Sequence, residues 1–131
     1  MGLEDTQIDV LQNIEFAVVS VYRERSELLD YDVMRALDAL IEVYRAESRG
    51  HTPKETQLPE PESLVFQRVK DMCEFRLGRK ELRINGQTTP GEEKTVDDIL
   101  ACLRKIRKSV DRWNKRGGQQ GYLKFVSQFV K

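Results

Sequence analysis

The spacing of apolar residues is the feature that most restricts how this chain can fold. Between residues 96 and 113 an apolar side chain recurs every three or four positions without a break. That is the period of an α-helix that buries one side. The stripe consists of Val96, Ile99, Leu103, Ile106, Val110 and Trp113. Because three earlier stretches show a related period, the sequence predicts an all-α fold.

The three earlier helices are predicted over residues 6–25, 31–48 and 61–77. In the first, the apolar arc covers more than half of the circumference, and Phe16 lies outside it. Such a helix is either central in its bundle or partly covered by a second subunit. Gly50 follows the second helix and can adopt the left-handed conformation that commonly ends one.

The predicted architecture is an antiparallel bundle of four main helices with a short C-terminal helix, within a single domain over residues 1–131. The fourth helix spans residues 96–116, is capped by Thr95 and ends at Gly117. The short link between the first two helices favours an antiparallel pair. Beyond Gly117, a short element carries four apolar residues on one side: Tyr122, Phe125, Val126 and Phe129.

Residues 81–89 are the least regular part of the chain. Residues 81–84 alternate polar and apolar side chains, and Asn85-Gly86 is the dipeptide most favoured in a two-residue hairpin turn. A small β-hairpin and a plain surface loop both fit this pattern.

The sequence lacks the patterns of a membrane or secreted protein. No apolar run approaches the roughly 20 residues that span a bilayer. Acidic residues Glu4, Asp5 and Asp9 stand where a secretory signal has a basic start and an apolar core. Cys73 and Cys102 form no CxxC pair, as expected of free thiols in a reducing compartment. We therefore expect a cytoplasmic protein with no membrane partner.

Motifs of catalysis are also missing from the sequence. The single histidine, His51, lies beside Gly50 in a predicted loop. A catalytic triad or a zinc site would need further histidine or cysteine residues at defined spacings. The glycines at 117–121 lack the lysine and serine that complete a phosphate-binding loop. We expect neither an enzyme nor a cofactor.

Charge is distributed unevenly, although 22 basic and 22 acidic residues cancel overall. Residues 1–65 contain 14 acidic and 6 basic side chains, whereas residues 104–131 contain 1 acidic and 9 basic ones. Six cations fall within about 120° of one another on the fourth helix. This basic face consists of Arg104, Lys105, Lys108, Arg112, Lys115 and Arg116. Three interpretations stay open: a solvated face, a contact with the acidic N-terminal helices of the same molecule or of a second copy, and a surface for nucleic acid. An acidic protein partner would suit the same face.

Two charged residues interrupt apolar helical faces. Glu15 projects into the arc of the first helix, and Arg76 projects between Val65 and Val69 on the third. An isolated buried charge is costly, so the two could form a buried ion pair. The alternative is that both lie at an edge of the bundle and reach water.

These observations favour a non-catalytic interaction or adaptor module that forms a homodimer through its first helix. The alternative is a nucleic-acid-associated protein that uses the basic face of residues 96–116. A third interpretation is an enzyme whose carboxylates and arginines meet at a subunit interface.

Overall fold

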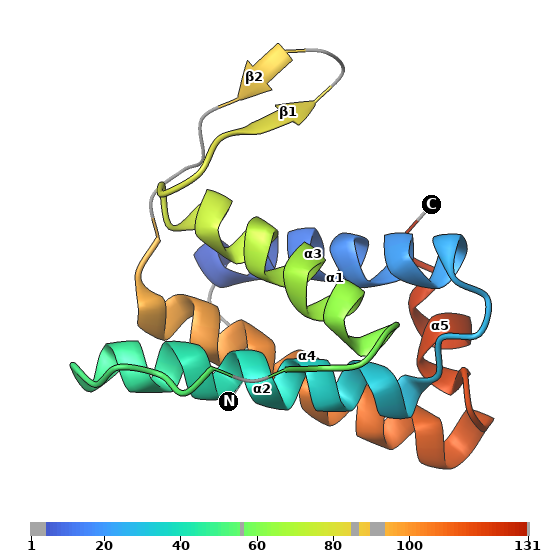
Figure 1. Ribbon diagram of the computed structural model, residues 1–131. Coiled ribbons are helices and arrows are strands. Elements are labelled where there is room, and N and C mark those ends of the chain that lie inside the picture. The colour runs from blue at the N-terminus through green and yellow to red at the C-terminus, as the bar shows by residue number, and fades with distance from the viewer. Residues whose placement is uncertain (1–4, 56, 85–86, 90–93, 131) are drawn as a thin grey trace.

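Five helices contain most of the residues that the structure describes (Figure 1). The computed structural model describes residues 5–55, 57–84, 87–89 and 94–130. The predicted helical class is confirmed, and the helix ends agree with the predictions to within one or two residues. The helices are α1 (Asp5–Glu24), α2 (Asp30–Ser48), α3 (Glu62–Arg76), α4 (Val96–Gly117) and α5 (Gly121–Val126).

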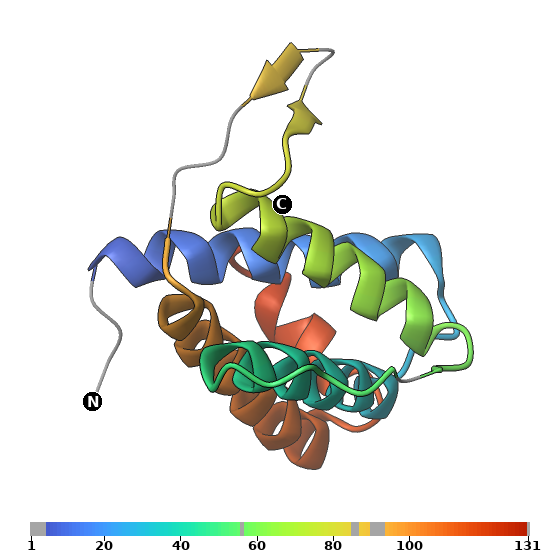
Figure 2. The ribbon, with the colours of Figure 1, turned by 60° about the vertical axis from the view of Figure 1, so that its left-hand side comes forward.

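The four long helices form two layers, α1 with α3 and α2 with α4 (Figures 1 and 2). Within the first layer, α3 runs antiparallel to α1, because Arg68 bonds to Glu24 while Arg76 bonds to Asp9. Within the second, α2 and α4 are also antiparallel: Asp38 contacts Arg107, and Ser48 contacts Asp97. Figure 2 shows α1 from the side while α2 and α4 are foreshortened, so the layers cross at an angle.

The predicted pairing of α1 with α2 is wrong. α1 packs mainly against α3, α4 and α5, and α2 packs mainly against α4 and α3. The link after α1 reverses the chain and also carries it into the other layer. Residues 49–55 and 57–61 then run back along α2 (Figure 1), so α3 begins beside the start of α2 and runs parallel to it.

Two short strands lie between α3 and α4. β1 (Leu82–Ile84) pairs antiparallel with β2 (Gln87–Thr89), with Leu82 opposite Thr89. This ribbon stands away from the helices in both views, so the packed core is helical (Figures 1 and 2). The predicted turn at residues 85–86 lies outside the described residues.

Local sequence accounts for several helix ends. The Thr95 hydroxyl accepts a hydrogen bond from the Asp98 N–H at 3.2 Å, and the Asp98 carboxylate accepts one from the Thr95 N–H at 3.1 Å. This reciprocal capping box satisfies two N–H groups that a helix start leaves unpaired. Gly50 adopts a φ of 73° beyond α2, as predicted.

α1 is central in this bundle. Val10, Ile14, Val18, Val19 and Val21 are all fully buried. They point in several directions around the helix, and α3, α4 and α5 of the same chain pack against α1. The width of its apolar arc is therefore largely explained without a second subunit.

A buried carboxylate joins the start of α2 to the start of α5. Asp30 has no exposed surface, and its side chain accepts hydrogen bonds from the Tyr22 hydroxyl and, at 2.9 Å, from the Tyr122 N–H. Its own N–H donates to the Gln119 carbonyl at 2.7 Å. Burial raises the pKa of the Asp30 carboxyl, while the bonds from Tyr122 and Tyr22 oppose that rise.

Neither aspartate at the start of α2, Asp30 or Asp32, is the N-cap of this helix. The N-cap position belongs to Leu29, whose N–H donates to the Asp32 carboxylate at 2.9 Å. Asp30 instead accepts from the first turn of α5, a contact 92 residues away in sequence. Helical periodicity cannot show such a long-range contact, because it reports only the side of its own helix to which a residue projects.

α5 lies unusually close to α4. A Cβ atom added to Gly121 would lie 2.0 Å from the Trp113 carbonyl oxygen, which is closer than atoms can approach. The ring of Trp113 also stacks on Phe125, with 4.3 Å between the ring centroids. Gly121 is thus required by close packing of backbone on backbone.

We predict that Gly121→Ala lowers the free energy of unfolding by about 2 kcal/mol or more, because the backbone must move to admit the methyl group. Gly117→Ala is the matched control, since nothing lies within 4 Å of its added Cβ. That change should be neutral or stabilising by up to about 1 kcal/mol. Urea unfolding measures both values, and equal effects would contradict the packing described for α5.

Candidate functional site

Three solvent-exposed apolar side chains border one groove between α1 and the C-terminal segment. Ile8, Phe16 and Phe129 are 39%, 52% and 67% exposed, respectively. The groove encloses about 500 Å³. Its remaining lining residues are Leu11, Gln12, Asn13, Glu15 and Val130. We call this feature the α1 groove.

The chain after α5 folds back to form one wall of the α1 groove. The N–H groups of Phe129 and Val130 donate to the Val126 carbonyl at 2.9 and 3.0 Å. The Arg23 guanidinium donates to the Val130 carbonyl at 3.1 Å, which ties this segment to the end of α1. Phe129 was predicted to pack with the other apolar residues of the last helix, but most of its ring faces solvent.

Glu15 is a half-buried acid in the lining of the α1 groove. Burial raises the pKa of its carboxyl. Within the part of the chain that the structure describes, no hydrogen bond or ion pair engages its side chain. After burial itself, the charges of Glu15 and Asp30 raise the pKa of the Tyr122 phenol. The ionised carboxylate of Glu15 is therefore a cost to the folded chain.

The predicted ion pair between Glu15 and Arg76 is not formed. Arg76 is buried, but its guanidinium donates to Asn13 and, at 2.8 Å, to Asp9. Asp9 and Asn13 are one helical turn apart on the side of α1 that faces α3. Glu15 is rotated by about 120° from Asp9 at 100° per residue, so it points away from Arg76.

The basic face of α4 lies on the solvent side of that helix. All six of its cations are exposed. Lys115 pairs with Asp111 at 3.2 Å, and the Arg116 guanidinium lies 5.6 Å from the centre of the Trp113 ring. The other four have no acidic partner among the described residues: Arg104, Lys105, Lys108 and Arg112. A seventh cation of α4, Arg107, is held by Asp38 at 2.9 Å.

A line of aromatic rings connects the end of α4 with the α1 groove. Trp113 stacks on Phe125, and Phe125 meets Phe129 edge to face at 5.3 Å between centroids. Phe129 in turn lines the groove. The sequence indicated the apolar side of each element. It could not show that Phe125 contacts both Trp113 and Phe129.

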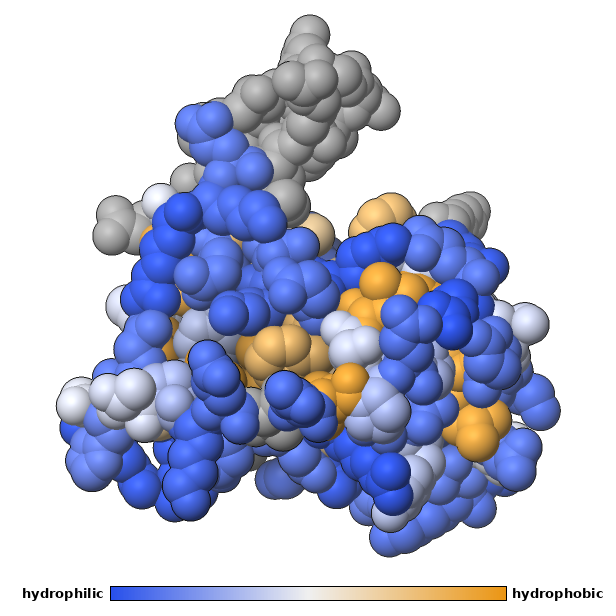
Figure 3. Space-filling model, viewed as in Figure 1, coloured by the Kyte–Doolittle hydropathy of each residue, from blue (hydrophilic) through white to orange (hydrophobic). Residues whose placement is uncertain are grey.

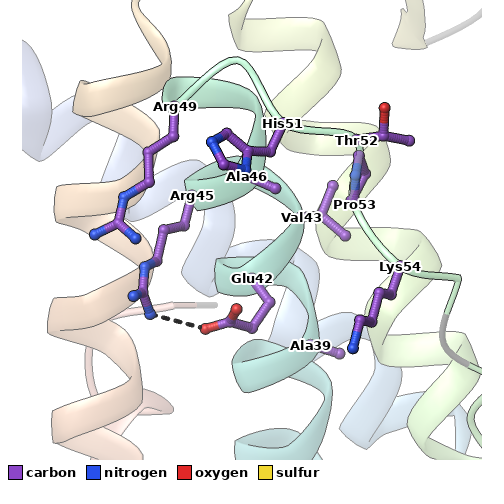
Figure 4. Close-up of a pocket in the computed structure, with 10 residues that line it drawn as sticks. All are labelled: Ala39, Glu42, Val43, Arg45, Ala46, Arg49, His51, Thr52, Pro53 and Lys54. Atoms are coloured by element: carbon purple, nitrogen blue, oxygen red, sulfur yellow. Dashed lines mark hydrogen bonds and ion pairs between the residues drawn. The ribbon is translucent and has the colours of Figure 1, made fainter.

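A cavity on the outer side of α2 was not predicted (Figure 4). It encloses about 420 Å³ between α2 and residues 51–54. Its floor consists of Ala39, Val43 and Ala46. Polar and charged residues complete it: Glu42, Arg45, Arg49, His51, Thr52 and Lys54, together with Pro53.

A second cavity adjoins the first. It encloses about 290 Å³ and shares Val43, Pro53 and Lys54 with its neighbour. Phe66 and Lys70 of α3 form its far side, and Glu55 and Gln57 complete the lining. On the face seen in Figure 3, apolar side chains lie at the bottom of a depression between hydrophilic ones. Neither cavity was predictable from the sequence, because the apolar residues between positions 51 and 57 follow no regular period.

The thiols and acids of the described residues form no metal cluster. No group of three or more His, Cys, Asp or Glu side chains within those residues could hold an ion. Cys73 and Cys102 are both buried and unpaired, and burial raises the pKa of Cys102 to about 11. A thiol with so high a pKa is a poor nucleophile near neutral pH.

Comparisons with known proteins identify no relative. No family model, no curated protein and no solved structure matches this chain. No helix among residues 5–55, 57–84 and 94–130 is long and apolar enough to cross a bilayer.

Proposed function

We propose that this protein is a non-catalytic interaction module that self-associates through the α1 groove. The observation that carries the proposal is the gathering of Ile8, Phe16 and Phe129 around one groove. Large apolar side chains clustered on a surface mark contact sites, whereas isolated ones need no explanation. Among the described residues the only other large apolar side chain classed as exposed is Tyr31, which lies against Arg35.

A second copy of the chain suits this groove on two grounds. The groove is formed largely by one helix, so two copies related by a twofold axis can bring two α1 helices together in antiparallel orientation. Each protruding Phe16 can then enter the space of about 500 Å³ beside the partner's helix. Antiparallel α1 helices also place the acidic start of one helix beside Arg23 near the end of the other, which is electrostatically favourable.

We predict that the protein forms a dimer at micromolar concentration and that Phe16→Asp and Phe129→Asp each shift it to monomer. A carboxylate placed in a closed apolar contact would lose its hydration without gaining a partner. Sedimentation equilibrium over a range of concentrations gives the masses, with 15.3 kDa as the monomer. Tyr31→Ser is the control, because Tyr31 is 54% exposed and does not line the groove. A wild-type monomer at all concentrations would contradict self-association.

A second candidate function is nucleic-acid binding through the basic face of α4. The observation in its favour is that Arg104, Lys105, Lys108 and Arg112 are exposed without an acidic partner among the described residues. Exposed cations along one helix face can follow a phosphate backbone. The neutral net charge of the chain argues against this function and in favour of the first.

If the basic face binds duplex DNA, the logarithm of the binding constant should fall with the logarithm of salt concentration at a slope of about −4 to −5. The triple variant Arg104→Glu, Lys108→Glu, Arg112→Glu should then abolish binding. Lys124→Glu, an exposed charge reversal on α5, should change it little. Fluorescence anisotropy with labelled DNA and RNA measures the salt dependence of binding and the affinities of the two variants. A lack of binding at low salt would remove this function, and binding that survives the triple variant would place it elsewhere.

A further inference from the structure

Some arginine residues of this fold are held firmly by acids, whereas other cations have no acidic partner among the described residues. Bidentate contacts hold Arg68 to Glu24 and Arg79 to Glu47 at 2.7 to 2.9 Å. Apart from the basic face of α4, three cations without an acidic partner among the described residues lie together: Arg49, Lys54 and Lys70. All three line the two adjoining cavities between α2, residues 51–55 and 57, and α3.

The two cavities form one binding-sized space. They share Val43, Pro53 and Lys54, and they enclose about 420 and 290 Å³. Small-molecule sites in proteins typically measure 300 to 1,000 Å³. Lys54 stands at the junction, so its ammonium is within reach of a ligand in either cavity.

The charge of this space is positive. Its lining contains four cations, Arg45, Arg49, Lys54 and Lys70, against two acids, Glu42 and Glu55. Glu42 and Arg45 pair at 3.2 Å and largely offset each other, which leaves Arg49, Lys54 and Lys70 against Glu55. In Figure 4, Lys54 extends along one side of the floor, whereas Arg45 and Arg49 extend from α2 toward the other. Cations on both sides of an apolar floor attract an anion.

The far cavity adds an apolar surface. The Phe66 ring is half-buried there, and the Lys70 ammonium lies 6.0 Å from its centre. An aromatic ring beside cations suits a ligand in which a planar apolar group is joined to a negatively charged one. His51 and Thr52 offer additional hydrogen-bonding groups at the other end.

We propose that this space is a binding site for a small organic anion that carries a planar ring and one or more phosphate groups. The anionic part lies among Arg49, His51 and Lys54, and the ring lies against Val43 and Phe66. This site is independent of the α1 groove and shares no lining residue with it. Binding there needs neither self-association nor the basic face of α4.

Three probes separate the parts of the proposal: adenosine triphosphate, adenosine and inorganic triphosphate, each without a metal ion. Adenosine triphosphate should bind with a Kd of about 1 mM or below, and each of the other two should bind at least about threefold more weakly. Amide shifts in NMR spectra of the labelled protein should locate its contacts at residues 39–54 and 66–70.

Two charge reversals test the residues. Arg49→Glu and Lys54→Glu should each weaken binding of adenosine triphosphate by about five- to tenfold, because each replaces an attraction by a repulsion. Both side chains are exposed, so these variants should fold normally. Lys108→Glu on α4 is the matched control for overall charge and should change the Kd by less than about twofold.

Several results would overturn the proposal. One is the absence of saturable binding of adenosine triphosphate up to about 10 mM. Another is a Kd for inorganic triphosphate equal to that for adenosine triphosphate, which would remove the role of Phe66. A third is an equal loss of affinity for adenosine triphosphate in Arg49→Glu, Lys54→Glu and Lys108→Glu, or amide shifts confined to α4. Either result would show that the ligand responds only to the overall charge of the protein.

Discussion

The hydrogen bonds of Asp30 are the constraint on which the C-terminal part of this fold depends. A carboxylate without exposed surface accepts from the Tyr22 hydroxyl at the end of α1 and from the Tyr122 N–H at the start of α5. The end of α1, the start of α2 and the start of α5, which is 92 residues further along the chain, therefore meet at one side chain. Leaving these donors unsatisfied in the interior would cost free energy, so the bonds define where α5 begins.

The position of α5 in turn determines the α1 groove. α5 is only six residues long, too short to be stable by itself, and it is held by Asp30, by Gly121 against α4 and by Phe125 on Trp113. The chain that follows carries Phe129 to the edge of α1. The proposed contact surface is thus a consequence of interior packing, because its second wall exists only while α5 is in place.

The sequence predicted the features that depend only on neighbouring residues of the same helix. The unbroken stripe of α4, the exposure of Phe16 and the capping by Thr95 follow from residues within a few positions of one another. Features that depend on which helix lies opposite were not predictable. Whether Arg76 is buried or reaches water stayed open. It is buried with Asp9 and Asn13 as its partners, because helical periodicity does not give the rotation of α1 toward α3. The cavities beside α2 depend on irregular residues, for which periodicity says nothing.

The dependence of the fold on Asp30 is tested most directly by the free energy of unfolding of Asp30→Ala, measured by urea titration at neutral pH. Asp30→Ala should lower this free energy by about 3 kcal/mol or more, because a buried hydroxyl and a backbone N–H lose their acceptor together. Asp32→Ala in the same helical turn, which loses only its bond from the Leu29 N–H, should cost about 1 kcal/mol. A loss for Asp30→Ala no larger than that of Asp32→Ala would contradict the central place given to Asp30.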